Sequence, residues 1–176
     1  VALAIGARER KGARVWSIDP HEWGKDPHPV HGDLAEYTPD DNQAFWNNIV
    51  ARELGHVVRA ITLPSAQAAR AWDGAINLLF IDGLHEYEHV KQDFELWGQH
   101  LAPDGMVAFH DTPWPGPGRL INELVASGQW EVAHRADQTT VLKRAAVIEP
   151  LVSVLIPAYN AALTVGRAIV SAMYQE

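Results

Sequence analysis

The sequence predicts an α/β fold: a Rossmann-like, mostly parallel sheet with helices on both faces and an antiparallel pair of strands at its C-terminal end. Short apolar or β-branched runs alternate with helical patterns from Arg14 to Gly128, which is the order of β/α units. Two further strand-like runs then follow each other with no helix between them. The chain has 176 residues, of which 47% are hydrophobic, so it is long enough to bury a core.

The N-terminal half contains signals for two strands and two helices. Residues 15–18 (VWSI) are mostly β-branched or aromatic and lead into Asp19-Pro20, a turn signal. A loop rich in Pro, His and Asp fills residues 20–41, and Asp40 or Asp41 then caps a helix. The apolar face of that helix consists of Phe45, Ile49, Val50 and Leu54. A second strand is predicted at Val57–Thr62, and a short alanine-rich helix, which Ser65 caps, at residues 65–72.

The C-terminal half begins with the clearest strand of the chain. Ile76–Ile81 (INLLFI) is an unbroken apolar run, which indicates a strand buried on both faces. A helix follows and ends before Pro103-Asp104-Gly105, and its apolar face consists of Tyr87, Val90, Phe94, Trp97 and Leu101. A strand at Met106–Phe109 and a Pro/Gly loop at Pro113–Gly118 come next. They are followed by a helix that Gly128 ends, with Leu120, Ile121, Leu124 and Val125 on its apolar face, and by two strands at Trp130–Ala133 and Thr140–Leu142.

Composition excludes several classes of protein. The formal net charge of −8 and the absence of a basic block argue against nucleic acid or an anionic membrane surface as the main partner. With no cysteine, the chain has no disulfide, no thiolate zinc site and no cysteine nucleophile, so a metal must be held by oxygen or imidazole. No apolar run reaches the roughly 18 to 20 residues that span a bilayer. We therefore expect a cytoplasmic protein that acts on a small molecule.

Acidic and imidazole side chains follow two of the predicted strands. Asp82 and His85 come after Ile76–Ile81, and His110 and Asp111 come after the next strand. Ligands of open parallel sheets bind at the carboxyl ends of the strands, so these groups should meet at one edge. Two carboxylates that lie close repel each other unless a cation or a proton lies between them, which suits Mg²⁺ with His110 as a nitrogen ligand. The alternative is that the two aspartates are only turn and capping residues.

The stretch from Leu79 to Thr112 resembles the class I S-adenosylmethionine-dependent methyltransferases, specifically the bacterial enzymes related to macrocin-type and catechol-type O-methyltransferases. In that family an aspartate ends the fourth strand and an acidic pair follows 28 and 29 residues later, at the positions of His110 and Asp111 here. Sugar O-methyltransferases also have a histidine three residues after the first aspartate, which is His85. The resemblance covers residues 1–144. His110 stands where the metal-dependent enzymes usually have Asp or Glu.

The resemblance implies a role for each of these residues. Asp82 and Asp111 would bind the metal, with His110 beside them, and His85 would be the general base. S-adenosylmethionine would be the cofactor. Asp19 would bind its ribose hydroxyls, Ser65 would contact its adenine, and Asp82 would also belong to the cofactor site. The alternative is that Asp19 is a solvated turn residue and Ser65 only a helix cap. The family's glycine-rich loop does not follow the first predicted strand, because Gly6 and Gly12 are wrongly placed for it. We expect that loop and the sheet's first strand to lie upstream of Val1, and the fragment alone to bind cofactor poorly.

The last 26 residues are similar to a different family. After a linker at residues 145–150, the segment 151–176 resembles the opening of a family 2 glycosyltransferase, with a strand at Val152–Ile156. In that family the residues just after this strand contact the nucleotide of a sugar donor, which implies such a role for Pro157, Tyr159 and Asn160. The alternative is a last strand and helix of the methyltransferase domain. We expect the chain to be a fragment, cut at both ends, of a fusion of the two domains.

The function that this sequence predicts is methyl transfer from S-adenosylmethionine to a hydroxyl of a sugar or glycan-like acceptor. One alternative is a protein that is chiefly a family 2 glycosyltransferase, in which residues 1–144 are inactive or only bind a ligand. Another is a nicotinamide-binding Rossmann domain, in which Asp19 would serve equally well. That alternative explains neither the spacing from Asp82 to Asp111 nor His85. The oligomeric state does not follow from the sequence.

Overall fold

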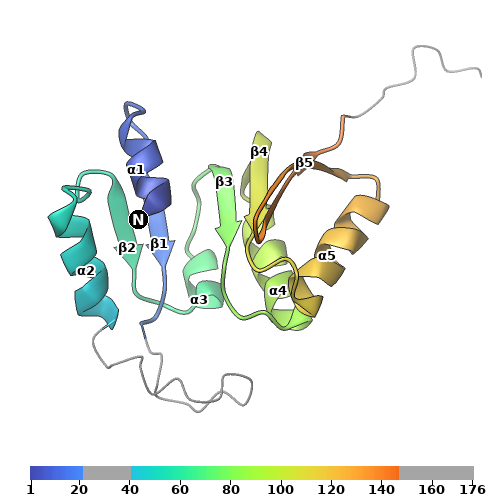
Figure 1. The fold of residues 1–176 in the computed structure, drawn as a ribbon, viewed down its shortest axis with the longest axis horizontal. Coiled ribbons are helices and arrows are strands. Elements are labelled where there is room, and N and C mark those ends of the chain that lie inside the picture. Colours follow the sequence, from blue (N-terminus) through green and yellow to red (C-terminus); the bar gives the residue numbers. More distant parts are fainter. Residues whose placement is uncertain (22–40, 147–176) are drawn as a thin grey trace, which may run out of the picture. The chain divides into compact units, whose positions relative to one another are not determined.

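A computed structural model describes residues 1–21 and 41–146 (Figure 1). The chain divides into two compact units, residues 1–144 and 145–176. Nearly all of the loop predicted at residues 20–41 lies outside the described residues, as do Pro157, Tyr159 and Asn160. The fold below is that of the first unit.

Strands and helices alternate in this unit up to a final pair of strands. In chain order they are α1 (Ala2–Arg8), β1 (Val15–Ile18), α2 (Asp41–Ala51), β2 (Val58–Ile61), α3 (Ser65–Ala69), β3 (Ile76–Ile81), α4 (Tyr87–Gly98), β4 (Leu101–Phe109), α5 (Pro115–Ala126), β5 (Trp130–Ala136) and β6 (Thr139–Arg144). The α/β class and the C-terminal antiparallel pair that the sequence predicts are confirmed. None of the described helices is both long and apolar enough to cross a membrane.

The strands form two sheets. Strands β1 and β2 are parallel, with Val15 opposite Val58, and make a two-stranded sheet. The other four strands are ordered β3-β4-β6-β5, in which β3 and β4 are parallel and β6 is antiparallel to both of its neighbours. Ile81 pairs with Phe109 at the last position of β3 and β4. The residues after those two strands therefore emerge side by side.

The core of the four-stranded sheet lies on one of its faces. Leu79 of β3, Val107 of β4 and Leu142 of β6 lie opposite one another across the strands, and all three are buried. They pack against helices α4 and α5, which contribute Val90, Trp97, Leu120 and Ile121. Burial of these faces positions the first turns of both helices at the carboxyl edge of the sheet, where the polar residues lie.

The prediction that Ile76–Ile81 is buried on both faces is wrong. Leu79 and Ile81 are buried, but Leu78 and Phe80 are 44% and 37% exposed. Helices α3, α4 and α5 supply the core on the Leu79 side. An apolar run does not distinguish a strand covered on both faces from one covered on a single face.

Two boundaries in the C-terminal half also differ from prediction. Leu101 and the segment Pro103–Gly105 belong to β4, because the N–H of Ile76 donates to the carbonyl of His100 and Ile76 pairs with Leu101. Gly105 is required there, since a Cβ would lie 2.8 Å from the carbonyl oxygen of Ile76. Helix α5 begins at Pro115, inside the predicted Pro/Gly loop. A proline suits the first turn of a helix, because its missing N–H has no intrahelical partner there.

Three smaller differences lie in the N-terminal half. Helix α1 is not predicted from the sequence. Val50, expected on the apolar face of α2, is exposed. Ser65 is not the N-cap of α3, because Pro64 occupies that position and makes no side-chain cap.

Candidate active site

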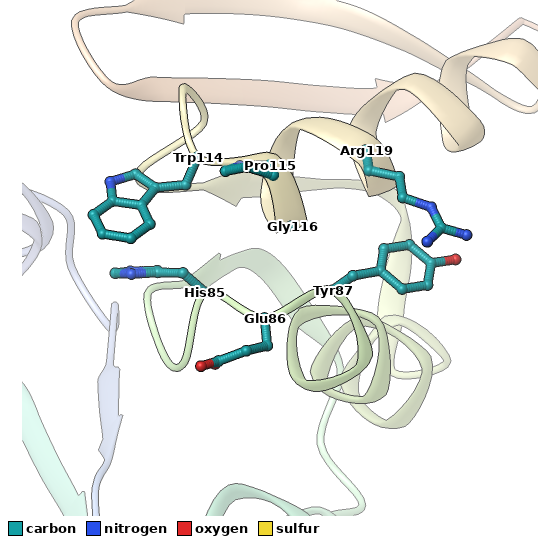
Figure 2. A pocket seen from close by; sticks show the side chains of 7 residues that line it. All are labelled: His85, Glu86, Tyr87, Trp114, Pro115, Gly116 and Arg119. Carbon is teal, nitrogen blue, oxygen red and sulfur yellow. The ribbon is translucent and has the colours of Figure 1, made fainter. Parts of the chain in front are cut away.

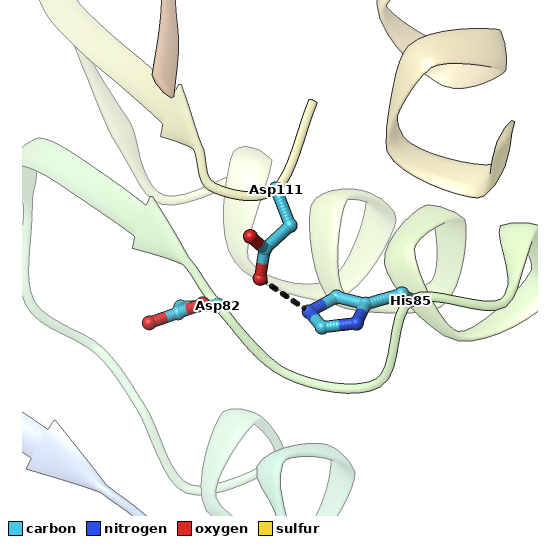
Figure 3. A group of neighbouring side chains, drawn as sticks. All are labelled: Asp82, His85 and Asp111. Atoms are coloured by element: carbon cyan, nitrogen blue, oxygen red, sulfur yellow. Dashed lines mark ion pairs between the residues drawn. The ribbon is translucent and has the colours of Figure 1, made fainter. Parts of the chain in front are cut away.

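Four side chains meet at the carboxyl ends of β3 and β4, as the sequence predicts. Asp82 and His85 come from the loop after β3, and His110 and Asp111 come directly after β4. Figure 3 shows His85 and Asp111 turned toward each other at this edge, with Asp82 beside them. The N–H of His110 donates to the carbonyl of Ile81 at 3.0 Å, which continues the parallel pairing by one residue and fixes the two strand ends together.

His85 and Asp111 form the closest pair of the cluster. Nε2 of His85 lies 2.9 Å from Oδ2 of Asp111, and both side chains are about four-fifths buried. A carboxylate at this distance holds the imidazole proton on Nε2, so the lone pair of the neutral ring is on Nδ1. An aspartate that orients a histidine in this way is a common arrangement for proton transfer.

The backbone of Asp111 is in the left-handed region, with φ at 49°. This conformation costs free energy in most residues and is tolerated best by Gly, Asn and Asp. Two contacts hold it: the carbonyl of Asp111 accepts from the N–H of Trp114 at 2.9 Å, and the next N–H, that of Thr112, donates to Gln138 at 3.0 Å. The turn directs the Asp111 carboxylate toward His85.

His110 lies between the two carboxylates. Its Nδ1 is 3.1 Å from Oδ1 of Asp82 and 3.1 Å from Oδ2 of Asp111. The sequence places His110 at this edge but does not show that one nitrogen reaches both acids. His110 lowers the pKa of Asp82 while Asp111 raises it, so His110 offsets part of the repulsion between the two carboxylates.

Partial burial raises the pKa of Asp82 above its ordinary value of 3.8. The charge of Asp111 raises it further, while His110 and His85 oppose the shift. A raised carboxyl pKa means that the negative charge is incompletely compensated at this site. A cation would relieve that cost.

The donor set of this cluster suits a hard divalent cation. One ligand atom each from Asp82, His85 and Asp111 can be chosen so that all lie within 4.8 Å of one another. The closest contacts of the two histidines with these acids are to Oδ1 of Asp82 and Oδ2 of Asp111. Carboxylate oxygens of this kind are the ligands that Mg²⁺ prefers.

Asp19 is at the end of β1, where the sequence places it. Its Oδ1 accepts from the N–H of His21 at 2.7 Å, and the N–H of Asp19 donates to the carbonyl of Ile61 at the end of β2. His21 has a positive φ of 52°, so the chain turns sharply just after this carboxylate. Asp19 is thus a fixed acidic group at the carboxyl edge of the two-stranded sheet.

Ser65 takes part in an interior hydrogen-bond network that the sequence does not indicate. Its hydroxyl donates to Oδ1 of Asp93 at 2.6 Å and accepts from Nε1 of Trp97 at 2.8 Å. Burial raises the pKa of Asp93, and the Ser65 hydroxyl opposes that shift. The network ties the start of α3 to α4 beneath the carboxyl edge.

A family model described as a methyltransferase domain matches residues 1–112, which is more than half of the chain. Among curated proteins, an uncharacterised protein of Sinorhizobium fredii, y4gI, is 50% identical over 40 residues. Those residues are 23% of this chain and 4% of that protein.

Solved structures with the same fold include three methyltransferases. The O-methyltransferase NovP aligns with a TM-score of 0.58 at 16% identity, over 81% of this chain and 64% of that one. An O-methyltransferase family protein from Burkholderia thailandensis has a TM-score of 0.54 at 16% identity, over 82% and 48%. Calicheamicin methyltransferase CalS11 has 0.52 at 18% identity, over 74% and 60%. The chain therefore spans less than two thirds of the length of these proteins.

Proposed function

Because the chain belongs to the methyltransferase domain family, we propose that it transfers a methyl group from S-adenosylmethionine to a hydroxyl of a sugar or glycan-like acceptor. The observation that carries this proposal is the contact between His85 and Asp111 at the carboxyl edge of the sheet. Direct displacement at a sulfonium requires that the hydroxyl be positioned in line and lose its proton. A buried, oriented imidazole at the ligand-binding edge can accept that proton.

His85 is the general base in this proposal and Asp111 is its orienting partner. The His85 imidazole accepts the proton of the acceptor hydroxyl, and the imidazolium that forms is stabilised by the Asp111 carboxylate. His110 contacts both Asp82 and Asp111, and it therefore helps to hold the Asp111 carboxylate beside His85. The methyl group moves from sulfur to oxygen, and S-adenosylhomocysteine leaves.

Asp19 is proposed to accept hydrogen bonds from the ribose hydroxyls of the cofactor. Its carboxylate is held by the N–H of His21, and it lies at the strand edge where Rossmann-like proteins bind a ribose. Asp82 and Ser65 would complete the cofactor site. Because the Ser65 hydroxyl already donates to Asp93, its part at the adenine would be to accept through its remaining lone pair or to donate through its backbone N–H.

Asp82 and Asp111 are proposed to hold a Mg²⁺ ion, with His110 adjacent. The raised pKa of Asp82 and the two carboxylates at one edge support this proposal. A bound Mg²⁺ would supply a positive charge that lowers the pKa of a nearby hydroxyl.

The sugar class of the acceptor is supported by His85, three residues after Asp82, a pattern that resembles the sugar O-methyltransferases. The solved neighbours NovP and the Burkholderia protein are both described as O-methyltransferases. Fusion to a family 2 glycosyltransferase is a separate proposal that depends on residues 151–176 alone. The sequence downstream of Glu176 tests it, because a donor-binding Asp-x-Asp motif should follow.

Binding of S-adenosylmethionine by the full-length protein, measured by titration calorimetry, tests the cofactor proposal. Asp19→Ala should weaken binding by about 1–3 kcal/mol, the range for losing a charged hydrogen-bond partner. Asp73→Ala is the matched control, because Asp73 is an exposed acid that precedes β3 at the opposite edge of the sheet. No binding by the unmodified protein would contradict the proposed cofactor, and equal affinity of Asp19→Ala would remove Asp19 from the site.

A further inference from the structure

A cavity of about 390 Å³ adjoins His85. It lies between the start of α4 and the start of α5, and Figure 2 shows the residues that line it. Its lining among the described residues is His85, Glu86, Tyr87, Trp114, Pro115, Gly116 and Arg119. The proposed function uses only His85 from this set.

A flat apolar surface lies beside the proposed base. The rings of Trp114 and His85 are 5.3 Å apart between centroids and tilted by 40° (Figure 2). Trp114 is 42% exposed, so part of the indole remains accessible to a ligand. A ring that enters the cavity can therefore pack on the indole while one of its substituents reaches His85.

The far wall of the cavity contains a cation that is already neutralised. The guanidinium of Arg119 lies 3.7 Å from the centre of the Tyr87 ring, and its Nε lies 2.9 Å from Oε1 of Glu123. The Tyr87 hydroxyl donates to the other oxygen of Glu123 at 2.6 Å. Arg119 is the one cationic residue among the described lining residues, and the Glu86 carboxylate lies near His89, pointing away from Trp114 and Arg119 (Figure 2). The cavity thus lacks the excess positive charge that binds phosphate or carboxylate groups.

The cavity walls are held together through the backbone. Gly116 packs directly on the segment from His85 to Tyr87, where a Cβ would overlap the carbonyl oxygen of His85. The Tyr87, Arg119 and Glu123 contacts join the same two helices on their exposed side. The position of Trp114 relative to His85 is therefore set by the packing of α5 on α4.

We propose that this cavity binds the acceptor as an uncharged sugar ring, whose apolar face packs on Trp114 and whose reacting hydroxyl points to His85. The proposal rests on the proposed function and names the acceptor's subsite and its class. A pyranose ring has one face of C–H groups and a rim of hydroxyls, which matches an indole surface bordered by an imidazole. A sugar bearing phosphate would meet only Arg119, whose guanidinium already pairs with Glu123, so the cavity offers such an anion no free counter-charge. Trp114 is then the residue that determines specificity.

Titration of simple sugars into the full-length protein saturated with S-adenosylhomocysteine tests this proposal. The probes are methyl α-L-rhamnopyranoside and methyl α-D-glucopyranoside, compared with glucose 1-phosphate and with catechol, and binding is followed by saturation-transfer NMR. Trp114→Ala should weaken glycoside binding about 3- to 10-fold, and Trp114→Phe should restore most of it, because a ring face is retained. Trp46→Ala, at a tryptophan of similar exposure on α2, should change nothing.

The outcomes separate this inference from the proposed function. Failure to bind S-adenosylhomocysteine would contradict the proposed function itself. Intact cofactor binding together with no glycoside binding, or with glycoside binding that Trp114→Ala leaves unchanged, would overturn the inference alone. Tighter binding of glucose 1-phosphate or of catechol than of either glycoside would also overturn it, because each result contradicts an uncharged sugar ring as the occupant.

Discussion

Gly116→Ala is expected to separate helix α5 from the segment that carries the proposed base. The added Cβ would overlap the carbonyl oxygen of His85 and lie 2.8 Å from the Tyr87 nitrogen and 3.0 Å from the Glu86 carbonyl carbon. Favourable carbon contacts begin near ~3.5 Å, so α5 or the segment 85–87 must move. All three crowded atoms are backbone, and no side-chain rotation can relieve them.

Overpacking of this kind costs typically ~1–3 kcal/mol, and the backbone overlap puts Gly116→Ala at the upper end, near ~3 kcal/mol. For a chain of this size each kcal/mol lowers the melting temperature by roughly 2–4 °C, so we expect a fall of roughly 6–12 °C. Thermal unfolding followed by circular dichroism measures it. The same variant should lose glycoside binding in the cavity, because Trp114 moves with α5.

Gly98→Ala is the matched control for this substitution. Gly98 is the last residue of α4, and a Cβ there would meet only the Phe94 side chain at an ordinary 3.5 Å. Alanine also favours a helix over glycine by up to ~1 kcal/mol, so this variant should melt at or above the temperature of the unmodified protein. An unchanged melting temperature for Gly116→Ala would refute the packing of α5 on the His85 segment.

The other predictions concern the charged groups. Burial raises the folded-state pKa of Asp93 above 3.8, so ionisation of Asp93 costs stability as the pH rises through that pKa. Asp93→Asn, which can still accept from Ser65, should therefore be more stable than the unmodified protein near pH 7 and equal to it below about pH 4. Urea unfolding at a series of pH values measures this, and a pH-independent difference would contradict it. Asp111→Asn tolerates the left-handed backbone but leaves one carboxylate in the cluster, so it should fold normally and bind Mg²⁺ more weakly by calorimetry. Unchanged Mg²⁺ affinity in Asp111→Asn would argue against the ion site, whereas Asp73→Asn should have no effect.

The local sequence predicted the edge of the sheet well, because the relevant signals are short in range. An apolar run ending in Asp82 and another ending before His110 and Asp111 place those residues at one edge once the strands are parallel neighbours. The contact between His85 and Asp111 depends further on the positive φ of Asp111. Nothing in the local pattern distinguishes that φ from an ordinary turn.

The features that the sequence did not predict depend on tertiary contacts. Ser65 looks like a helix cap, but its hydroxyl bonds Asp93, 28 residues away. The Pro/Gly run before Leu120 is typical of a loop, and it becomes the first turn of α5 because Gly116 lets the helix approach the segment 85–87. Gly116 also lines the cavity beside His85, so the same approach forms one of the cavity walls.

The most direct test of the account is the rate of methyl transfer to a glycoside acceptor when His85 is removed. Single-turnover transfer from methyl-labelled S-adenosylmethionine would be compared between the full-length protein, His85→Ala and His89→Ala, in which the lost imidazole is an exposed one on α4. If His85 is the general base, His85→Ala should be slower by ~100-fold or more with nearly unchanged cofactor affinity, and His89→Ala should retain the full rate. Equal rates for the two variants would contradict the assignment of this edge as the catalytic site.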